Sequence, residues 1–140
     1  MPKNAMTDEE IMNCFEIMSQ LRPHLEETEF VDKVRTMESE GYKLAYIEDN
    51  SNIVAVCGYR MYSNLFMGKH LYVDDLVTSA SHRSQGYGES MINWLRELAI
   101  QNDCIYLHLD SGTQREQAHK FYFKHGFTIA SFHFSEKLEK

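Results

Sequence analysis

The residues most suited to chemistry lie between Arg83 and Gly88, in the polar, glycine-bearing run RSQGYG. This run falls where a strand rich in β-branched and aromatic residues, His70 to Ser79, gives way to an amphipathic helix that ends near Gln101. Glycine lets the backbone turn so that successive amide N–H groups point outward, and the start of the helix adds partial positive charge. The sequence therefore predicts an anion-binding site here, with a pyrophosphate as the anion that fits best.

A glycine pair before a helix is also what an ordinary tight turn with a helix cap requires, so the run alone leaves both interpretations open. Two nucleotide-binding motifs are excluded. A dinucleotide-binding fingerprint needs a third small residue at the position of Met91, and a phosphate-binding P-loop needs Gly-Lys followed by Ser or Thr. The run therefore predicts either a turn or an anion site of another class.

The seven histidines do not form a metal-binding pattern. His119 and His125 are six positions apart, whereas zinc sites show tighter spacing such as HExxH. A hydrolase with a Ser-His-Asp triad is also not expected, because the chain has no Gly-x-Ser-x-Gly turn. We therefore expect no metal cofactor.

Length and charge narrow the functional classes. The 140 residues, 43% of them hydrophobic, suit a single globular domain over residues 1–140. The formal net charge of -7, with no basic cluster, repels a nucleic-acid backbone, so no nucleic-acid partner is expected. A negative field instead favours cationic small molecules, including amines.

The cysteines and the N-terminal segment bear on the compartment. The three cysteines show neither disulfide nor metal-ligand spacing, which predicts buried free thiols in a reducing environment. The opening run MPKNAMTDEE lacks an apolar secretory core, and no uncharged stretch approaches the roughly 18 residues of a membrane span. We expect a cytoplasmic protein with no membrane partner.

Hydrophobic periodicity predicts the elements that position the RSQGYG run. A capping box of Thr7 and Glu10 opens a first helix that continues to Pro23, and a second helix is expected from about Glu29 to Glu40. Strands are expected at 42–50, 52–62, 70–79, 104–112 and 127–134, and further helices at 88–101 and 115–126. This order mixes antiparallel and parallel pairing in one sheet, which is an α/β fold of the α+β mixed-sheet type.

Two segments, LVTSASHRSQGYG and the later AHKFYFKHGF, resemble the characteristic motifs of the GNAT superfamily of acyl-CoA-dependent N-acyltransferases. The first motif of that family is Gln or Arg, two residues, Gly, one residue, then Gly or Ala. The second is a closing helix with Ala, two residues, Phe-Tyr, two residues and Gly-Phe. The two segments lie about thirty residues apart in the family's order, and the resemblance is close over Leu71 to Phe127.

The resemblance implies a three-layer fold whose mixed, mostly antiparallel sheet is splayed between two parallel strands and flanked by about four helices. It implies acetyl-CoA as co-substrate, with the pantetheine arm in the splay, bonded to the backbone of Leu76, Val77 and Thr78. The pyrophosphate would lie on the loop residues Arg83, Ser84, Gln85, Gly86, Tyr87 and Gly88. Arg115 stands where the family often has Asn, so a charged contact would replace that one.

The reaction requires a neutral amine, a donor for the oxyanion and a proton for the departing thiolate. By resemblance, Tyr122 matches the tyrosine that protonates the coenzyme A sulfur, and a phenol with a pKa near ~10 stays protonated at neutral pH. Asp74 and Asp75 are the candidates to take the proton of the amine. Strand alternation predicts that they lie on opposite faces, so only one faces the substrate. The family register favours Asp74, and a substrate-binding or structural role for both stays open.

The sequence thus predicts an N-acetyltransferase in which the amine of a small molecule attacks acetyl-CoA directly. Two alternatives stay open: a non-catalytic acyl-CoA-binding regulatory module, and an acetyltransferase acting on protein amines. The first two helices and the loop from Arg22 to Thr28 are expected to select the acceptor. The tail after Phe127 is short for two full strands, which leaves a sheet edge that favours pairing with a second copy in a homodimer.

Overall fold

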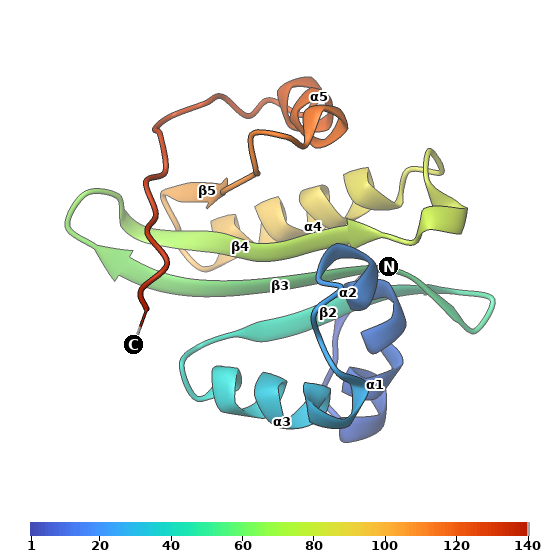
Figure 1. Cartoon of the computed structure of the whole chain (residues 1–140). Coiled ribbons are helices and arrows are strands. Elements are labelled where there is room, and N and C mark those ends of the chain that lie inside the picture. The colour runs from blue at the N-terminus through green and yellow to red at the C-terminus, as the bar shows by residue number, and fades with distance from the viewer. Residues whose placement is uncertain (140) are drawn as a thin grey trace. The chain divides into compact units, whose positions relative to one another are not determined.

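The computed structural model describes residues 1–139, which divide into two compact units, Met1–Leu109 and a second that begins at Asp110. The first unit holds one five-stranded sheet in the order β1-β2-β3-β4-β5 (Figure 1). Its strands are β1 Lys3–Asn4, β2 Lys43–Asp49, β3 Asn52–Asn64, β4 Gly68–Thr78 and β5 Tyr106–Leu109. Its helices are α1 Asp8–Asn13, α2 Phe15–Leu21, α3 Glu27–Glu38, the 3₁₀ helix η1 Ala80–His82, and α4 Tyr87–Gln101. The predicted mixed α/β class is confirmed.

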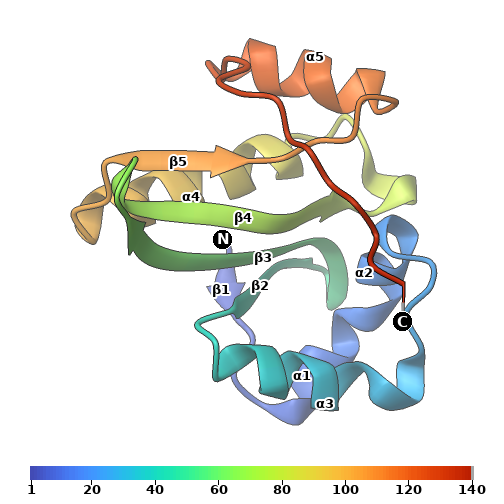
Figure 2. The ribbon, with the colours of Figure 1, turned by 60° about the vertical axis from the view of Figure 1, so that its left-hand side comes forward.

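The pairing of the strands confirms the predicted mixture of directions. β1, β2, β3 and β4 pair antiparallel in succession, and β4 pairs with β5 in parallel. Figure 2 shows the arrows of β4 and β5 pointing the same way. A parallel pair needs a crossover connection, and α4 supplies it between these two strands.

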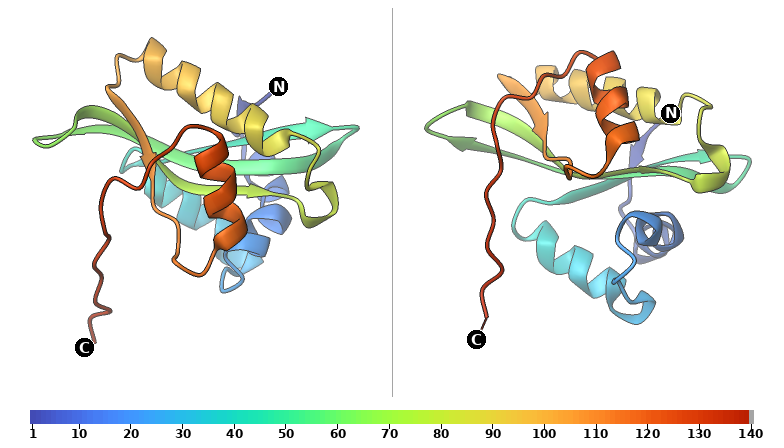
Figure 3. Two further views of the ribbon diagram at one scale, coloured as in Figure 1. Left: turned by 90° about the horizontal axis from the view of Figure 1, so that it is seen from above. Right: turned by 45° about the horizontal axis from the view of Figure 1, so that its top comes forward.

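Two hydrophobic cores lie on opposite faces of the sheet in the first unit. Helices α1, α2 and α3 cover one face and α4 covers the other (Figures 1 and 3). Leu44 and Val56 point into the core beneath α1 to α3, whereas their neighbours Ala45 and Cys57 belong to the core beneath α4. This alternation is what a strand buried on both faces requires. The unit therefore has the three layers that the resemblance implies.

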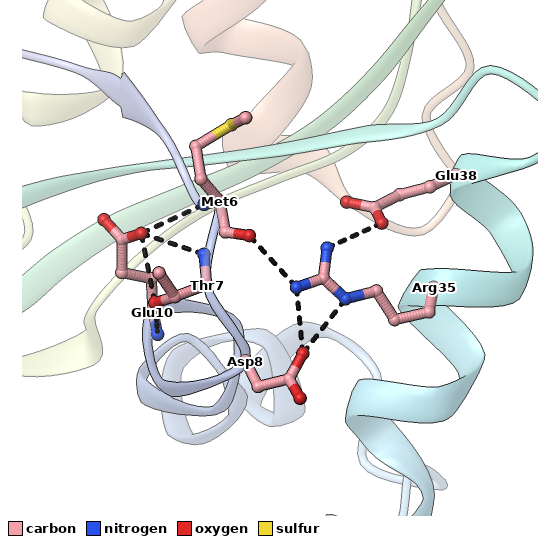
Figure 4. Close-up of polar contacts among 6 residues, drawn as sticks. All are labelled: Met6, Thr7, Asp8, Glu10, Arg35 and Glu38. Atoms are coloured by element: carbon pink, nitrogen blue, oxygen red, sulfur yellow. Dashed lines mark hydrogen bonds and ion pairs between the residues drawn. The ribbon is translucent and has the colours of Figure 1, made fainter.

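The start of α1 is fixed by the predicted capping box. The Thr7 hydroxyl accepts a hydrogen bond from the Glu10 amide at 3.1 Å, and a Glu10 carboxylate oxygen accepts from the Thr7 amide at 3.0 Å (Figure 4). The other carboxylate oxygen of Glu10 accepts from the Tyr46 hydroxyl at 2.8 Å. Glu10 thus satisfies the exposed end of α1 and also ties this helix to β2.

Arg35 joins α3 to the start of α1. Its guanidinium donates to the Asp8 carboxylate at 2.8 Å, to the Met6 carbonyl at 3.0 Å and to the Glu38 carboxylate at 2.9 Å (Figure 4). Asp8 lies in the first turn of α1, where a negative charge complements the helix dipole. One side chain therefore holds two helices of the same layer together.

The first helix is broken, whereas the sequence predicts it to be continuous up to Pro23. The Cys14 amide donates to the Ile11 carbonyl, three residues back, at 3.0 Å, and the Cys14 thiol donates to the Glu10 carbonyl at 3.4 Å. The thiol thus takes the acceptor that α-helical continuation would use, and the turn tightens between α1 and α2.

No helix within residues 1–139 is long and apolar enough to cross a membrane.

The cysteines carry free thiols, as the sequence predicts. Cys14 and Cys57 are buried, whereas Cys104 is only half-buried. Burial raises the pKa of Cys14 to about 12, so this thiol stays protonated and packs as a small apolar group. The prediction of burial is therefore confirmed for two of the three.

The second unit contains helix α5, Glu116–Lys124, which ends before Gly126 at a left-handed φ of 89°. This confirms the predicted last helix. The strand predicted at 127–134 is wrong, because residues 127–139 form neither helix nor strand. A strand persists only when another strand edge pairs with it, and an apolar segment does not supply that edge by itself.

The hydrogen bonds that the Glu10 carboxylate accepts predict a contribution to stability that is lost in acid. Hydrogen bonds from the Thr7 amide, then from the Tyr46 hydroxyl, lower the pKa of Glu10 from 4.5 to about 2. A lowered folded-state pKa contributes stability above the unfolded value, and this is lost as the pH falls toward the folded one. We expect Glu10→Gln to be less stable than wild type at pH 7, with a gap that shrinks between pH 4.5 and 2.

Urea unfolding at pH 7 and pH 3 measures that gap, and Glu9→Gln is the matched control. Glu9 occupies the same first turn of α1 and is exposed. It should show little change at either pH. A Glu10→Gln gap of equal size at both pH values would contradict the assignment of the effect to the carboxylate charge.

Candidate active site

β5 separates from β4 partway along the parallel pair. The pairing runs from His70 opposite Tyr106 to Val73 opposite Leu109 and stops there. β4 continues to Thr78, and beyond Val73 its only partner strand among residues 1–139 is β3. Residues 74–78 therefore present an open main-chain edge, and this is the splay that the resemblance implies.

A β-bulge begins the open segment. Tyr59 of β3 lies opposite Val73, whereas its neighbour Gly58 lies opposite Asp75, so Asp74 is the extra residue of β4. A bulge of one residue reverses the alternation of side chains and main-chain groups that follow it. The groups that β4 turns outward therefore change at this point.

Two hydrogen bonds define which main-chain groups face the open edge. Before the bulge, the Lys69 carbonyl accepts at 2.7 Å from the amide of the residue that precedes β5. After the bulge, the Ser79 amide donates to a main-chain carbonyl of β3, that of Val54, at 2.8 Å. Because alternate residues point the same way, Leu76 and Thr78 turn their N–H and C=O groups to the open edge. Val77, between them, turns these groups to β3 and buries its side chain in the core beneath α1 to α3.

The loop after β4 presents a series of unpaired amides. Ser84 and Gly86 adopt left-handed φ values of 67° and 85°, and Gly86 is the N-cap of α4 without a side-chain cap. At the start of α4, the Ser90 amide donates to Gly86 at 3.0 Å, and the amides of Tyr87, Gly88 and Glu89 precede this first helical hydrogen bond among the described residues. The dipole of a 15-residue helix adds positive charge at the same place. The loop can therefore hold an anion through its main chain.

Side chains from two distant elements hold this loop. The Tyr87 hydroxyl donates to the carboxylate of Asp49, at the end of β2, and this bond raises the pKa of Tyr87. Gln20 of α2 accepts from the Ala80 amide at 2.8 Å, at the start of η1. Asp49 and Gln20 carry no motif, so sequence reasoning missed both. No signal short of the tertiary contacts identifies them.

Asp74 and Asp75 are both bound by arginines, and the prediction that they lie on opposite faces is wrong. Arg60 binds Asp74 with two nitrogens, at 3.0 and 2.8 Å. Arg22 binds Asp75 at 3.0 Å, and the Tyr42 hydroxyl donates to the other oxygen of Asp75 at 2.8 Å. The Arg60 guanidinium also lies over the Tyr42 ring, 5.6 Å from its centre, so both carboxylates gather around Tyr42. The bulge at Asp74 breaks the alternation on which the prediction depended.

The position of the Tyr42 side chain depends on a glycine in β3. Tyr42 is buried, and burial followed by the charge of Asp75 raises its pKa well above 10. A Cβ atom at Gly58 would overlap the Tyr42 ring and hydroxyl. Only glycine therefore leaves room for this contact, and the sequence signals it only as a glycine inside a strand pattern.

The second unit carries the two other predicted site residues. Arg115 directly precedes α5, and Tyr122 lies within it. The Tyr122 ring packs against Phe121 and Phe127, with ring centres 5.4 and 5.6 Å away. Burial raises the pKa of Tyr122 above 10, and Arg115 partly opposes this. The phenol therefore stays protonated at neutral pH and is available as a donor.

Comparisons with known proteins agree with this geometry. The sequence model of the acetyltransferase (GNAT) family matches residues 7–127, a range that includes the open edge, the loop and Tyr122. The chain is also 35% identical, over 138 residues, to the uncharacterized N-acetyltransferase YhdJ of Bacillus subtilis (strain 168). That match covers 97% of each chain.

Solved structures share the fold at low sequence identity. Ribosomal-protein-alanine N-acetyltransferase from Brucella melitensis superposes with a TM-score of 0.83 at 11% identity, over 99% of each chain. Glucosamine-6-phosphate N-acetyltransferase from Arabidopsis thaliana gives a TM-score of 0.77 at 19% identity, also over 99% of each chain. The names of these two proteins specify different acceptors, so the shared fold does not determine the acceptor.

The contact between Gly58 and Tyr42 gives a stability prediction. We expect Gly58→Ala to destabilise the protein by about 1–3 kcal/mol, because the methyl group forces Tyr42 out of its place. Urea unfolding of Gly58→Ala, of Tyr42→Ala and of the double variant forms a double-mutant cycle. In the Tyr42→Ala background the added methyl group should cost clearly less. Strict additivity of the two changes would show that Tyr42 is not what the Cβ atom meets.

Proposed function

The chain belongs to the acetyltransferase (GNAT) family, and from this premise we propose that it transfers an acetyl group from acetyl-CoA to the amine of a small molecule. One observation carries the proposal. The open edge at Leu76 and Thr78 leads along the chain to the loop from Arg83 to Gly88, which ends in the unpaired amides at the start of α4. An acyl-CoA has amides in its pantetheine arm and a pyrophosphate beyond them, in the order that these groups require.

Binding through the main chain fits the composition of this protein. A chain of net charge -7 offers few cations for a polyphosphate, and in the loop only the exposed Arg83 is basic. Unpaired amides at a helix start provide the missing positive potential. In this proposal Ser84, Gln85 and Tyr87 contribute mainly their backbone, and the Tyr87 side chain keeps its bond to Asp49.

The proposed reaction is direct transfer. The neutral amine nitrogen attacks the thioester carbonyl carbon, the carbon–sulfur bond breaks, and the sulfur leaves with a proton from Tyr122. The ammonium form of the acceptor first releases one proton to become the neutral amine. After the attack, the nitrogen loses a second proton as the amide forms, and this proton restores the Tyr122 phenol that has protonated the thiolate. The raised pKa of Tyr122 is consistent with a phenol that is protonated at the start of each cycle. Arg115, in the same unit, would contribute a charged contact to the co-substrate.

Small amines are the proposed acceptors because the protein is acidic. A net charge of -7 attracts the cationic form of an amine and raises its local concentration. Acetylation of protein amines is the alternative, and an amine panel that includes peptides with a free N-terminus distinguishes the two. The carboxylates that would receive the cation are those of the bulge.

The first prediction concerns coenzyme A. Calorimetric titration should detect saturable binding, and acetyl-CoA with an amine panel should release thiol above background.

Gly86→Val should weaken coenzyme A binding at least about tenfold, because a β-branched residue resists the left-handed φ of 85°. Gly41→Val is the matched control, since Gly41 has a φ of 96° and equal free space around its Cβ position.

Absence of heat in the coenzyme A titration of folded protein would overturn the proposed function. Binding without thiol release on any amine would support the alternative of a non-catalytic acyl-CoA-binding module. An equal loss of affinity in Gly41→Val would place the effect in stability rather than in the loop.

A second prediction concerns the proton donor. We expect Tyr122→Phe to lower kcat by about 10²- to 10⁴-fold, as loss of a general acid does, with coenzyme A affinity nearly unchanged. Tyr62→Phe is the control, because Tyr62 is a half-exposed tyrosine near the end of β3. Unaltered turnover in Tyr122→Phe would remove this residue from the mechanism.

A further inference from the structure

We propose that Arg22 determines acceptor specificity, because its guanidinium occupies on Asp75 the place that the ammonium group of the acceptor takes during the reaction. The inference rests on the proposed function and deepens it in two ways. It assigns the acceptor contact to Asp75 rather than Asp74, and it defines the acceptor as a cationic amine.

The two carboxylates of the bulge are bound in different ways. Asp74 gives both of its oxygens to the fork of Arg60, at 3.0 and 2.8 Å. The side chain of Asp74 is 21% exposed and that of Arg60 is 23% exposed, so the two are about equally accessible to solvent. A two-bond fork between partly buried groups is a strong and closed arrangement. Both oxygens of Asp74 are therefore held by one arginine, which an acceptor would have to displace from two bonds.

Asp75 divides its oxygens between a fixed partner and an exposed one. The fixed partner is Tyr42, whose hydroxyl donates at 2.8 Å and whose ring is buried against Gly58. Tyr42 cannot shift toward Gly58, and it orients the carboxylate independently of Arg22. The geometry of Asp75 is therefore preserved when its second partner leaves.

The exposed partner is Arg22. Its side chain is 42% exposed, whereas that of Asp75 is only 13% exposed, so the guanidinium forms the solvent side of the pair. Arg22 donates one hydrogen bond to a carboxylate oxygen and one to the Asp74 carbonyl, each at 3.0 Å. Only the Arg22 side of this pair is open to water, so another cation can approach the Asp75 carboxylate from that side in place of the guanidinium.

The position of Arg22 in the chain connects this pair to both substrates. Arg22 is the C-cap of α2 and begins the segment before α3 that was predicted to select the acceptor. Asp75 directly precedes Leu76, whose main-chain groups face the open edge proposed for the pantetheine arm. An ammonium group on Asp75 would therefore lie next to the strand segment that holds the co-substrate.

The test compares Arg22→Gln with Arg35→Gln as a matched control. Arg35 is 39% exposed and also forms ion pairs through its guanidinium, but with the carboxylates of Asp8 and Glu38. The probe is 1,4-diaminobutane, titrated by calorimetry into protein saturated with coenzyme A, followed by measurement of KM and kcat with acetyl-CoA. Arg22→Gln should bind the diamine about two- to fivefold more tightly and lower its KM, because a surface ion pair of this strength no longer competes. Arg35→Gln should match wild type in both the diamine affinity and KM.

Two further variants separate competition from a structural role. Arg22→Lys keeps a competing cation and should restore wild-type affinity, while Asp75→Asn should abolish diamine binding and Asp74→Asn should not. Diamine affinity that is unchanged or weaker in Arg22→Gln overturns the proposal, as does failure of the wild type to bind the diamine. The coenzyme A titration and the amine panel test the proposed function separately, so failure of one is distinguishable from failure of the other.

Discussion

The β-bulge at Asp74 is the feature on which the candidate site depends. One extra residue in β4 reverses which main-chain groups point outward, and it coincides with the place where β5 ends its pairing. A regular strand here would turn the groups of Leu76 and Thr78 to β3, where the sheet would satisfy them. The bulge instead leaves them free on an otherwise buried strand, and unpaired main-chain groups at such a place require a partner.

The loop that follows β4 supplies the second half of the site by the same means. Among the described residues, the amides of Tyr87, Gly88 and Glu89 precede the first hydrogen bond of α4, and the left-handed φ of Gly86 turns the chain into this helix. Such a loop keeps its shape only if other elements hold it. Tyr87 bonded to Asp49 and Gln20 bonded to Ala80 provide this support from β2 and α2. The site therefore relies on backbone conformation, and its side chains mainly stabilise that conformation.

The same bulge also gathers two carboxylates around Tyr42. Each is compensated by an arginine, so the cluster adds no net charge where an anionic co-substrate is proposed to bind. The two arginines bind differently. Arg60 holds Asp74 with two hydrogen bonds, whereas Asp75 is bound by the more exposed side chain of Arg22. On this asymmetry rests our proposal that Asp74 is structural and that Asp75 receives the cationic acceptor. It arises from Gly58, whose missing side chain admits the Tyr42 ring.

The sequence by itself determined the fold class, the capping box at Thr7, the turn that leads from β4 into α4 and the motif around Tyr122. These features depend on local periodicity, on glycine at defined positions and on short spacings, which a linear chain displays directly. Only the tertiary structure decided the faces of Asp74 and Asp75, the partners Arg22, Arg60 and Tyr42, and the absence of a strand at 127–134 within the described residues. A bulge, a pairing edge and an ion pair between distant residues each depend on a neighbouring element, and no local pattern specifies which element that is.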